Sequence, residues 1–166
     1  MTTIRKADQK DLPAVLEIIN QAKRYFASQK IPQWQTGYPE EIDIQEDLDR
    51  DGGYVAVENH EVVGYCFIKV MTDHNYDVIE GQWLNDQPYA VMHRTCIHDS
   101  CKGRGIAGMF IETAYGLCDN VRADTHEKNA SMRKMLENHG FIACGTVYME
   151  DGTPRIGYQK IRKGRN

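Results

Sequence analysis

A short segment rich in glycine and basic residues is the part of this chain best suited to bind a ligand. It runs Lys102-Gly103-Arg104-Gly105-Ile106-Ala107-Gly108 and comes directly before a helix-like pattern. Glycines let backbone N–H groups approach a ligand, and a helix N-terminus adds free donors and a positive dipole end. The segment is therefore a candidate cradle for a pyrophosphate. It matches neither the dinucleotide fingerprint nor the Walker A spacing, and a purely structural tight turn is the alternative.

Hydropathy and turn patterns predict the elements that would position this segment. A helix is expected to begin at Leu12, with Asp11 as its cap, and to end before Pro32. The remaining expected elements are a strand at 4–7, an acidic helix within 40–51, a hairpin of strands 54–58 and 62–70, a loop at 71–88, a strand at 90–98, a helix at 106–115, a strand at 121–126, a helix at 129–138 that ends at Gly140, and a hairpin at 141–161 around Asp151-Gly152. The acidic charges of 40–51 are interpreted as a solvated helix face.

Length and composition exclude several classes of protein. The chain has 166 residues, with 20 Lys and Arg against 24 Asp and Glu, and a net charge of −4. That length predicts a single domain over residues 1–166, and the charge argues against a nucleic-acid partner. No apolar run is long enough to cross a membrane, and the N-terminus lacks an apolar signal core. Five scattered cysteines without a CxxC pair indicate reduced thiols, no structural metal and a cytoplasmic location.

The order of these elements resembles the GNAT N-acetyltransferase superfamily over nearly the whole chain. That family carries the phosphate motif Arg/Gln-x-x-Gly-x-Gly/Ala, which residues 102–107 match with Lys102 at the first position. A second family signature, an Asn followed eleven and twelve residues later by Gly-Phe, is matched by Asn129 and Gly140-Phe141. The resemblance implies an α/β (α+β) fold. Its mixed, mostly antiparallel sheet would hold a central splayed pair of parallel strands, with helices on both faces.

The resemblance also implies that acetyl-CoA is the co-substrate, bound between the splayed strands 92–97 and 121–126. Its pantetheine arm would pair with the backbone near Cys96 and Ile97, and Asn129 would contact the arm from the other side. The pyrophosphate would lie on the N–H groups of 103–108, and because Lys102 lacks a planar fork, backbone donors would carry most of this site. A backbone N–H near Ile97 would polarise the thioester carbonyl.

Direct transfer to an amine needs a base and a proton source for the leaving thiolate. His93, four residues before Ile97, is the best base candidate because some family members place a histidine there and an imidazole pKa of about 6.5 suits the task. On this strand Thr95 and Ile97 would share the face of His93, opposite Arg94 and Cys96. A hydrogen-bonded structural histidine is the alternative.

His126 and Asp124 share a face of the neighbouring strand, and such a pair would orient the amine or act as base, unless His126 only caps the next helix. Many family members carry a Tyr as acid four residues before the Gly-Phe glycine, where this chain has Leu136. Tyr148 is a replacement candidate, and water is another proton source.

Aromatic loops are the expected walls of the acceptor site. Trp34 and Tyr38 lie in the loop between the first two helices, and Tyr76, Trp83 and Tyr89 lie in the long segment before the central strand. Anchoring of these loops to the core is the alternative reading. We expect an acetyl-CoA-dependent N-acetyltransferase acting, as monomer or homodimer, on a primary amine of a small molecule or a protein. A non-catalytic acyl-CoA sensor and an α/β interaction domain without CoA remain alternatives.

Overall fold

A computed structural model describes residues 1–162. Eight strands form one mixed sheet in the order β1-β2-β3-β5-β6-β8-β7-β4, in which β5 and β6 are the parallel pair. The strands are β1 Thr3–Lys6, β2 Gly53–Glu58, β3 Glu61–Val70, β4 Glu80–Gly81, β5 Ala90–Ile97, β6 Asn120–Thr125, β7 Ile142–Tyr148 and β8 Pro154–Ile161. The helices are α1 Leu12–Ser28, α2 Glu41–Asp49, α3 Ile106–Leu117 and α4 Ala130–Asn138.

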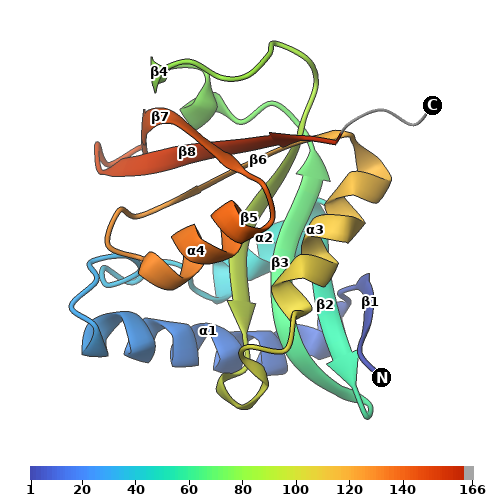
Figure 1. Ribbon diagram of the computed structural model, residues 1–166. Coiled ribbons are helices and arrows are strands. Elements are labelled where there is room, and N and C mark those ends of the chain that lie inside the picture. Colours follow the sequence, from blue (N-terminus) through green and yellow to red (C-terminus); the bar gives the residue numbers. More distant parts are fainter. Residues whose placement is uncertain (163–166) are drawn as a thin grey trace. The chain divides into compact units, whose positions relative to one another are not determined.

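Each predicted helix and strand is present in the described chain (Figure 1). One strand was not expected, because β4 lies within the segment 71–88 that reads as a loop. It is only two residues long and pairs with β7, a partner more than sixty residues away. A segment this short has no hydrophobic periodicity from which a strand can be recognised.

The described chain divides into two compact units, and each is described by itself. The first unit contains residues Met1–Ile68 and Arg94–Thr113, and the second contains Lys69–His93 and the chain from Ala114 onward. The chain passes between the units three times: inside β3 between Ile68 and Lys69, inside β5 between His93 and Arg94, and inside α3 between Thr113 and Ala114.

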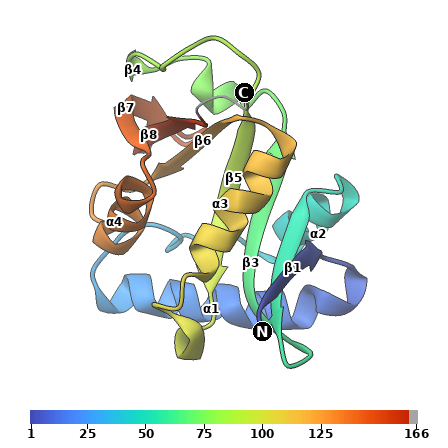
Figure 2. The same cartoon turned by 45° about the vertical axis from the view of Figure 1, so that its right-hand side comes forward.

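In the first unit, helices cover both faces of the sheet (Figures 1 and 2). Register pairs Val55 with Tyr65 and Ala56 with Gly64, so the first pair and the second pair face opposite sides. On the Val55 side the buried core is formed by α1, α2 and three strands: Leu12, Val15, Ile18, Ile19, Ile44, Val55, Tyr65 and Cys96. On the Gly64 side the first turns of α3 approach, since a Cβ on Gly64 would lie 3.3 Å from Phe110.

Two sequence expectations about this unit are wrong. Asp11 does not cap α1 through its side chain; it accepts two hydrogen bonds from the Arg5 guanidinium and one from the Asp8 N–H. The acidic helix α2 is not only a solvated face, because the Asp47 side chain is buried among polar partners. No pattern in the sequence indicated that a carboxylate would be buried beside Ile44.

The second unit is built on β6, which pairs with β5 on one edge and β8 on the other. Beyond β6, the chain forms α4 and the β7–β8 hairpin. Helix α4 ends as the sequence predicts: Gly140 has φ +85°, its N–H donates to Glu137 O, and the Phe141 N–H donates to Leu136 O. These two bonds close the helix in a Schellman motif.

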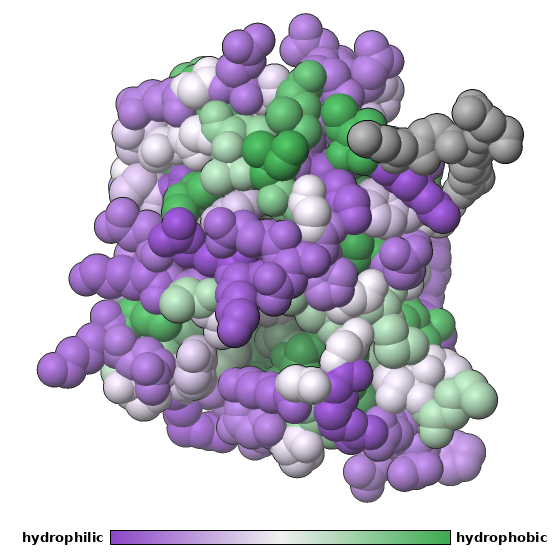
Figure 3. Space-filling view, in the orientation of Figure 1, coloured by the Kyte–Doolittle hydropathy of each residue, from purple (hydrophilic) through white to green (hydrophobic). Residues whose placement is uncertain are grey.

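The second unit keeps several large apolar side chains at its surface. Apolar atoms gather in the upper centre of the space-filling view (Figure 3). The exposed side chains of this unit include Val78 at 73% and Ile142 at 53%. Exposed apolar surface of this kind is typical of surfaces that partner proteins cover.

The cap of α4 gives the first prediction. Gly140→Ala places a Cβ on a left-handed residue and should lower the free energy of unfolding by about 1 kcal/mol. Gly116→Ala is the matched control, because Gly116 is helical and nothing lies within 4 Å of its Cβ position. That variant should be more stable than the original chain, since alanine favours helix. Urea unfolding measures both, and equal signs for the two variants would contradict the assignment of the cap.

Candidate functional site

The glycine turn before α3 is open to a ligand. Gly103 has φ +77° and Gly105 has φ +81°, and nothing lies within 4 Å of a Cβ built at either position. Helix α3 begins at Ile106, so the N–H groups of Ile106, Ala107 and Gly108 have no carbonyl partner within the helix. Gly105 has no side chain with which to cap them. The turn therefore offers a row of backbone donors to an anion, and the residues present fit a bound pyrophosphate.

The basic side chains of this turn are already paired. The Lys102 Nζ lies 3.1 Å from Asp99 Oδ1 and 4.3 Å from the centre of the Tyr25 ring. One nitrogen of Arg104 contacts both carboxylate oxygens of Glu58, at 2.7 and 2.6 Å, and this pairing raises the pKa of Arg104. The carboxylates offset much of the positive charge that the sequence suggested for the turn. Backbone N–H groups are left as its main anion donors.

The strand β5 contains a backbone irregularity at Arg94. Its φ is +56°, a left-handed value that costs a non-glycine residue roughly 1 kcal/mol or more. Beyond it the strand alternates as predicted, because Arg94 and Cys96 face the α1 and α2 side while Ile97 lies against the Gly64 position on the other side. The His98 N–H donates to Val63 O on β3 at 2.8 Å. Since alternate residues of a strand point to opposite edges, the Ile97 N–H points away from β3.

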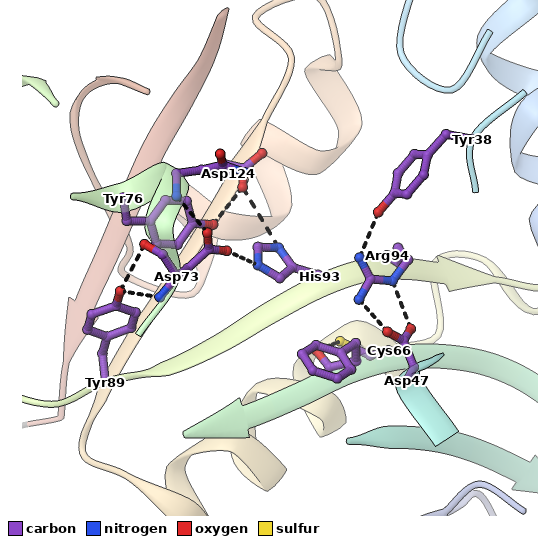
Figure 4. Close-up of polar contacts among 11 residues, drawn as sticks. Tyr38, Asp47, Cys66, Asp73, Tyr76, Tyr89, His93, Arg94 and Asp124 are labelled. Carbon is purple, nitrogen blue, oxygen red and sulfur yellow. Dashed lines mark hydrogen bonds and ion pairs between the residues drawn. The ribbon is translucent and has the colours of Figure 1, made fainter. Parts of the chain in front are cut away.

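A buried ion pair lies at this irregularity (Figure 4). The Arg94 Nε and Nη2 donate to the two Asp47 carboxylate oxygens at 2.8 and 2.6 Å. The Tyr65 hydroxyl donates to the same carboxylate at 2.6 Å, and the Arg94 Nη1 donates to the Tyr38 hydroxyl at 2.7 Å. The guanidinium lies 5.0 Å from the centre of the Phe67 ring. Burial raises the pKa of Tyr65, as does the Asp47 carboxylate that it hydrogen-bonds.

In the second unit the parallel strands are paired over a short stretch. The register joins Ala90 to Val121 and Val91 to Arg122 and does not continue to Met92 and Ala123, both of which belong to this unit. Parallel strands that stop pairing leave backbone groups that a ligand can use. This is the separation that the sequence leads us to expect.

His93 is surrounded by carboxylates and aromatic rings of the second unit (Figure 4). Its Nε2 lies 2.6 Å from Asp73 Oδ2, and its Nδ1 lies 3.8 Å from Asp124 Oδ2. The Tyr76 hydroxyl donates to Asp124 at 2.5 Å, and the Tyr89 hydroxyl accepts the Asp73 N–H at 2.8 Å. We call His93, Asp73, Asp124, Tyr76 and Tyr89 the His93 cluster.

Charge and burial act together in the His93 cluster. Burial disfavours ionisation of Asp73, but the hydrogen bond and charge of His93 outweigh it and bring the pKa of Asp73 below its ordinary value. Burial and the Asp124 carboxylate raise the pKa of Tyr76 well above its ordinary value, so this phenol stays a donor. An imidazole held by one carboxylate at Nε2, with a second near Nδ1, is well arranged to accept and hold a proton.

Sequence reasoning missed Asp73, and it placed Tyr76 only among the loop aromatics expected to line the acceptor site. Both lie in the segment 71–88, which has no strand or long helix pattern and therefore no predictable side-chain direction. Tyr76 is only 2% exposed, which no local pattern indicates. The acidic side chain before an aromatic-rich loop was the one available signal, and it does not specify a histidine twenty residues later.

The other candidate acid–base residues have partners of their own. His126 lies just past the end of β6, and its Nδ1 accepts the Lys128 N–H at 3.0 Å, as expected for a helix-entry cap. Burial and Arg155 lower the pKa of His126. Tyr148 is 40% exposed and donates to Glu80 at 2.9 Å, which raises the pKa of its hydroxyl. Leu136, at the position of the family tyrosine, is buried at 1% exposure.

Asn129 and Cys96 are held within the protein. The Asn129 side-chain oxygen accepts the Met132 N–H at 3.2 Å and caps α4. The Cys96 side chain packs in the core of the first unit, and burial raises the pKa of its thiol. Cys96 therefore offers a ligand its backbone and not a reactive sulfur.

The aromatic residues of the first unit anchor their loop. The Trp34 ring meets the Phe26 ring edge-on at 5.4 Å and packs on the core of this unit. Tyr38 stays 42% exposed although its hydroxyl accepts from Arg94. Trp34 thus follows the anchoring alternative, and Tyr38 presents the more accessible face.

In the second unit Trp83 and Tyr89 enclose a buried cation. The Arg122 guanidinium lies 4.2 Å from the Trp83 ring centre and 4.1 Å from that of Tyr89. Trp83 also donates to Tyr76 O at 2.9 Å. These rings, with Tyr76 and Asp77, line a pocket of about 450 Å³. Tyr76 and Tyr89 belong both to this pocket and to the His93 cluster.

Comparison with known proteins identifies the family. The model of the acetyltransferase (GNAT) family matches residues 14–141. A GNAT-family acetyltransferase from Streptococcus agalactiae 2603 is 32% identical, with a TM-score of 0.91, over 98% of this chain and 96% of that chain. No curated protein matches significantly.

More distant solved structures share the fold. Ard1 from Thermoplasma volcanium is 16% identical with a TM-score of 0.70, over 98% of this chain and 99% of that one. The ribosomal-protein-S18-alanine N-acetyltransferase from Escherichia coli is 13% identical with a TM-score of 0.66, over 100% and 97%.

The chain belongs to the GNAT acetyltransferase family. The resemblance seen in the sequence is therefore confirmed, as is the mixed sheet with its single parallel pair. Within residues 1–162, no group of three or more His, Cys, Asp or Glu side chains is placed to hold a metal ion. Among the helices of that same range, none is long and apolar enough to span a membrane.

The depressed pKa of Asp73 gives a pH-dependent prediction. A carboxylate whose pKa is lowered by folding stabilises the protein above its unfolded pKa of about 3.9, and this contribution is lost as pH falls through the folded pKa. Asp73→Asn should therefore lower the free energy of unfolding by about 2 kcal/mol at pH 7. Its difference from the original chain should shrink below about pH 4.

Urea unfolding from pH 3 to 7 measures this difference. Asp77→Asn is the control, since Asp77 is an exposed carboxylate four residues away. It should change stability by less than about 0.5 kcal/mol at every pH. A constant gap between the Asp73 variant and the original chain would exclude an ionised, paired Asp73.

Proposed function

We propose that this protein is an acetyl-CoA-dependent N-acetyltransferase that moves an acetyl group directly to a primary amine. The observation that carries the proposal is the open glycine turn at the start of α3, where two left-handed glycines have empty space above them. Family membership supports the choice of ligand. We further propose that residues 1–166 act as one acetyltransferase domain in the cytoplasm, without nucleic acid, membrane or metal.

The turn and the following N–H groups bind the pyrophosphate of acetyl-CoA in this proposal. Gly103 and Gly105 allow close approach, and Ile106, Ala107 and Gly108 donate. Lys102 and Arg104 contribute less than their charges suggest, because Asp99 and Glu58 hold them. Acetyl-CoA supplies the acetyl group as an activated thioester. The Ile97 N–H polarises the thioester carbonyl and stabilises the charge that develops on its oxygen.

His93 accepts the proton of the attacking amine in this proposal. Because Nε2 donates to Asp73, the accepting atom is Nδ1, and the nearby carboxylate of Asp124 stabilises the imidazolium that forms. Tyr148 and water are the proton sources for the leaving thiolate. His126, which caps its turn, is the weaker base candidate.

The acceptor is a primary amine of a small molecule or of a protein. Tyr38 supports an aromatic contribution to its binding, since its ring is accessible. Trp83, Tyr89 and Asp124 contribute through the second unit, where aromatic rings and carboxylates suit an ammonium group before it loses its proton. Buried Leu136 at the family's tyrosine position favours a second candidate, an acyl-CoA sensor that binds without transfer. We expect the protein to be a monomer or a homodimer, whether it is the enzyme or the sensor.

The glycine turn gives a prediction for binding. Gly105→Val should abolish acetyl-CoA binding, because the new side chain blocks the approach to the backbone. Gly152→Val is matched to it, since Gly152 has φ +83° and equally empty space but lies in the β7–β8 turn. Both variants should lose similar stability, while the control still gains about 2.7 kcal/mol from acetyl-CoA at a hundred times its dissociation constant.

Thermal unfolding with and without acetyl-CoA separates the two variants. If neither acetyl-CoA nor CoA stabilises the original chain, both the acetyltransferase and the acyl-CoA sensor are refuted. Binding without release of CoA thiol across a panel of amines would favour the sensor.

The His93 cluster gives a prediction for turnover. His93→Ala should lower kcat by about 10²–10⁴-fold while acetyl-CoA affinity changes little, since the base acts on the amine. His74→Ala, an exposed histidine of the same unit, should leave kcat unchanged. Thiol release measures kcat and calorimetry measures affinity, and unchanged turnover in the first variant would discard His93 as base.

A further inference from the structure

The left-handed residue in β5 is the feature that the proposed function does not yet explain. Arg94 has φ +56° within a strand whose other residues are extended. Arginine gains nothing intrinsic from this conformation, whereas glycine or asparagine would tolerate it easily. Backbone outliers of this kind persist only where surrounding contacts determine them, and they gather at functional sites.

The contacts that determine it are on the Arg94 side chain. Three of its nitrogens are used: two on Asp47 and one on the Tyr38 hydroxyl. Asp47 is 4% exposed and also accepts from Tyr65, so α2 and β3 together fix the carboxylate. A buried pair of this kind holds one geometry, because separating it leaves two uncompensated charges in the core.

The conformation of Arg94 decides which way the following N–H groups point. Backbone N–H groups along a strand point alternately to its two edges. An extra, irregular residue shifts this alternation by one, so that every later N–H group points to the opposite edge. With Arg94 left-handed, the His98 N–H faces Val63 on β3 and the Ile97 N–H faces away from β3. We expect that an extended residue at this place would shift the alternation by one and turn the Ile97 N–H towards β3.

We propose that Arg94, Asp47 and Tyr65 are positioning residues for the transfer reaction: they hold the left-handed turn of β5 and so keep the Ile97 N–H aimed at the reacting carbonyl. This inference rests on the proposed function. It assigns a catalytic purpose to the buried acid of α2, although none of the three side chains needs to touch the substrate.

The test compares substitutions that distinguish the effect of the backbone conformation at position 94 from the effect of losing the ion pair. Arg94→Ala removes the pair and leaves a residue that resists φ +56°, whereas Arg94→Gly removes the pair but adopts that φ freely. Arg5→Ala is the control for loss of an ion pair, because Arg5 makes a two-bond contact with Asp11 in the same unit.

Steady-state kinetics should divide these variants. We expect Arg94→Ala to lower kcat by about 10²-fold, comparable to loss of one oxyanion donor, with KM for acetyl-CoA changed less than threefold or so. Arg94→Gly should recover at least about tenfold of that loss. Arg5→Ala should keep the original kcat. Equal kcat in the Ala and Gly variants, or a loss in Arg5→Ala that matches Arg94→Ala, would overturn the proposal.

Amide hydrogen exchange at Ile97 and His98 gives a readout that needs no activity. Arg94→Ala should change exchange at both amides, and Arg94→Gly should keep the original pattern. Original exchange rates in Arg94→Ala would overturn the inference even if the chain transfers no acetyl group. Failure of acetyl-CoA to bind the original chain, with exchange behaving as expected, would instead refute the proposed function alone.

Discussion

Strand β5 belongs to a sheet and, in the function proposed above, also presents its backbone to a ligand; the left-handed turn at Arg94 is the constraint by which we propose that it does both. On one side of the turn, Ala90 and Val91 pair in parallel with β6. On the other, His98 follows the strand and still donates to β3. The backbone geometry of the turn then fixes which edge of the strand the N–H groups of the intervening residues face. The turn carries an unfavourable φ, so the chain stabilises it with a buried ion pair anchored in α2. The packing of α2 against the core is therefore tied to the backbone of β5.

The two units differ in the polar groups that each one holds. In the first, the glycine turn offers backbone donors, and its basic side chains are neutralised by Asp99 and Glu58. Such a site selects ligands by their shape and by their interaction with the backbone N–H dipoles more than through net charge. In the second, two carboxylates lie around His93, and Tyr76 holds one of them. That arrangement favours positive charge, which both an incoming ammonium group and an imidazolium would bring.

Family membership constrains the reaction class and leaves the acceptor to this chain's own residues. The S18-alanine enzyme of Escherichia coli shares the fold at 13% identity, and so its acceptor says nothing about this one. We propose that selectivity comes from the segments between regular elements. One of these, 71–88, supplies Asp73 and Tyr76 to the His93 cluster and Trp83 to the pocket around Arg122. This segment, which is among the least regular in sequence, thus contributes two of the five residues of the His93 cluster.

The sequence by itself determined the four α-helices, the strands other than β4, the glycine turn and the resemblance to the family. Those signals are local: helical spacing along α1, the turn glycines Gly103 and Gly105, and the cap at Gly140 each depend on residues within one turn of each other. His93 was also found from the sequence, as a titratable side chain on a strand. Tertiary structure alone decided what surrounds it, because Asp73 reaches it from twenty residues away and Asp124 from thirty-one. It likewise decided that Asp47 is buried against Arg94, and that Lys102 and Arg104 are paired. Electrostatic partners depend on distance in space, and a hydropathy pattern carries no information about pairs that far apart in the chain.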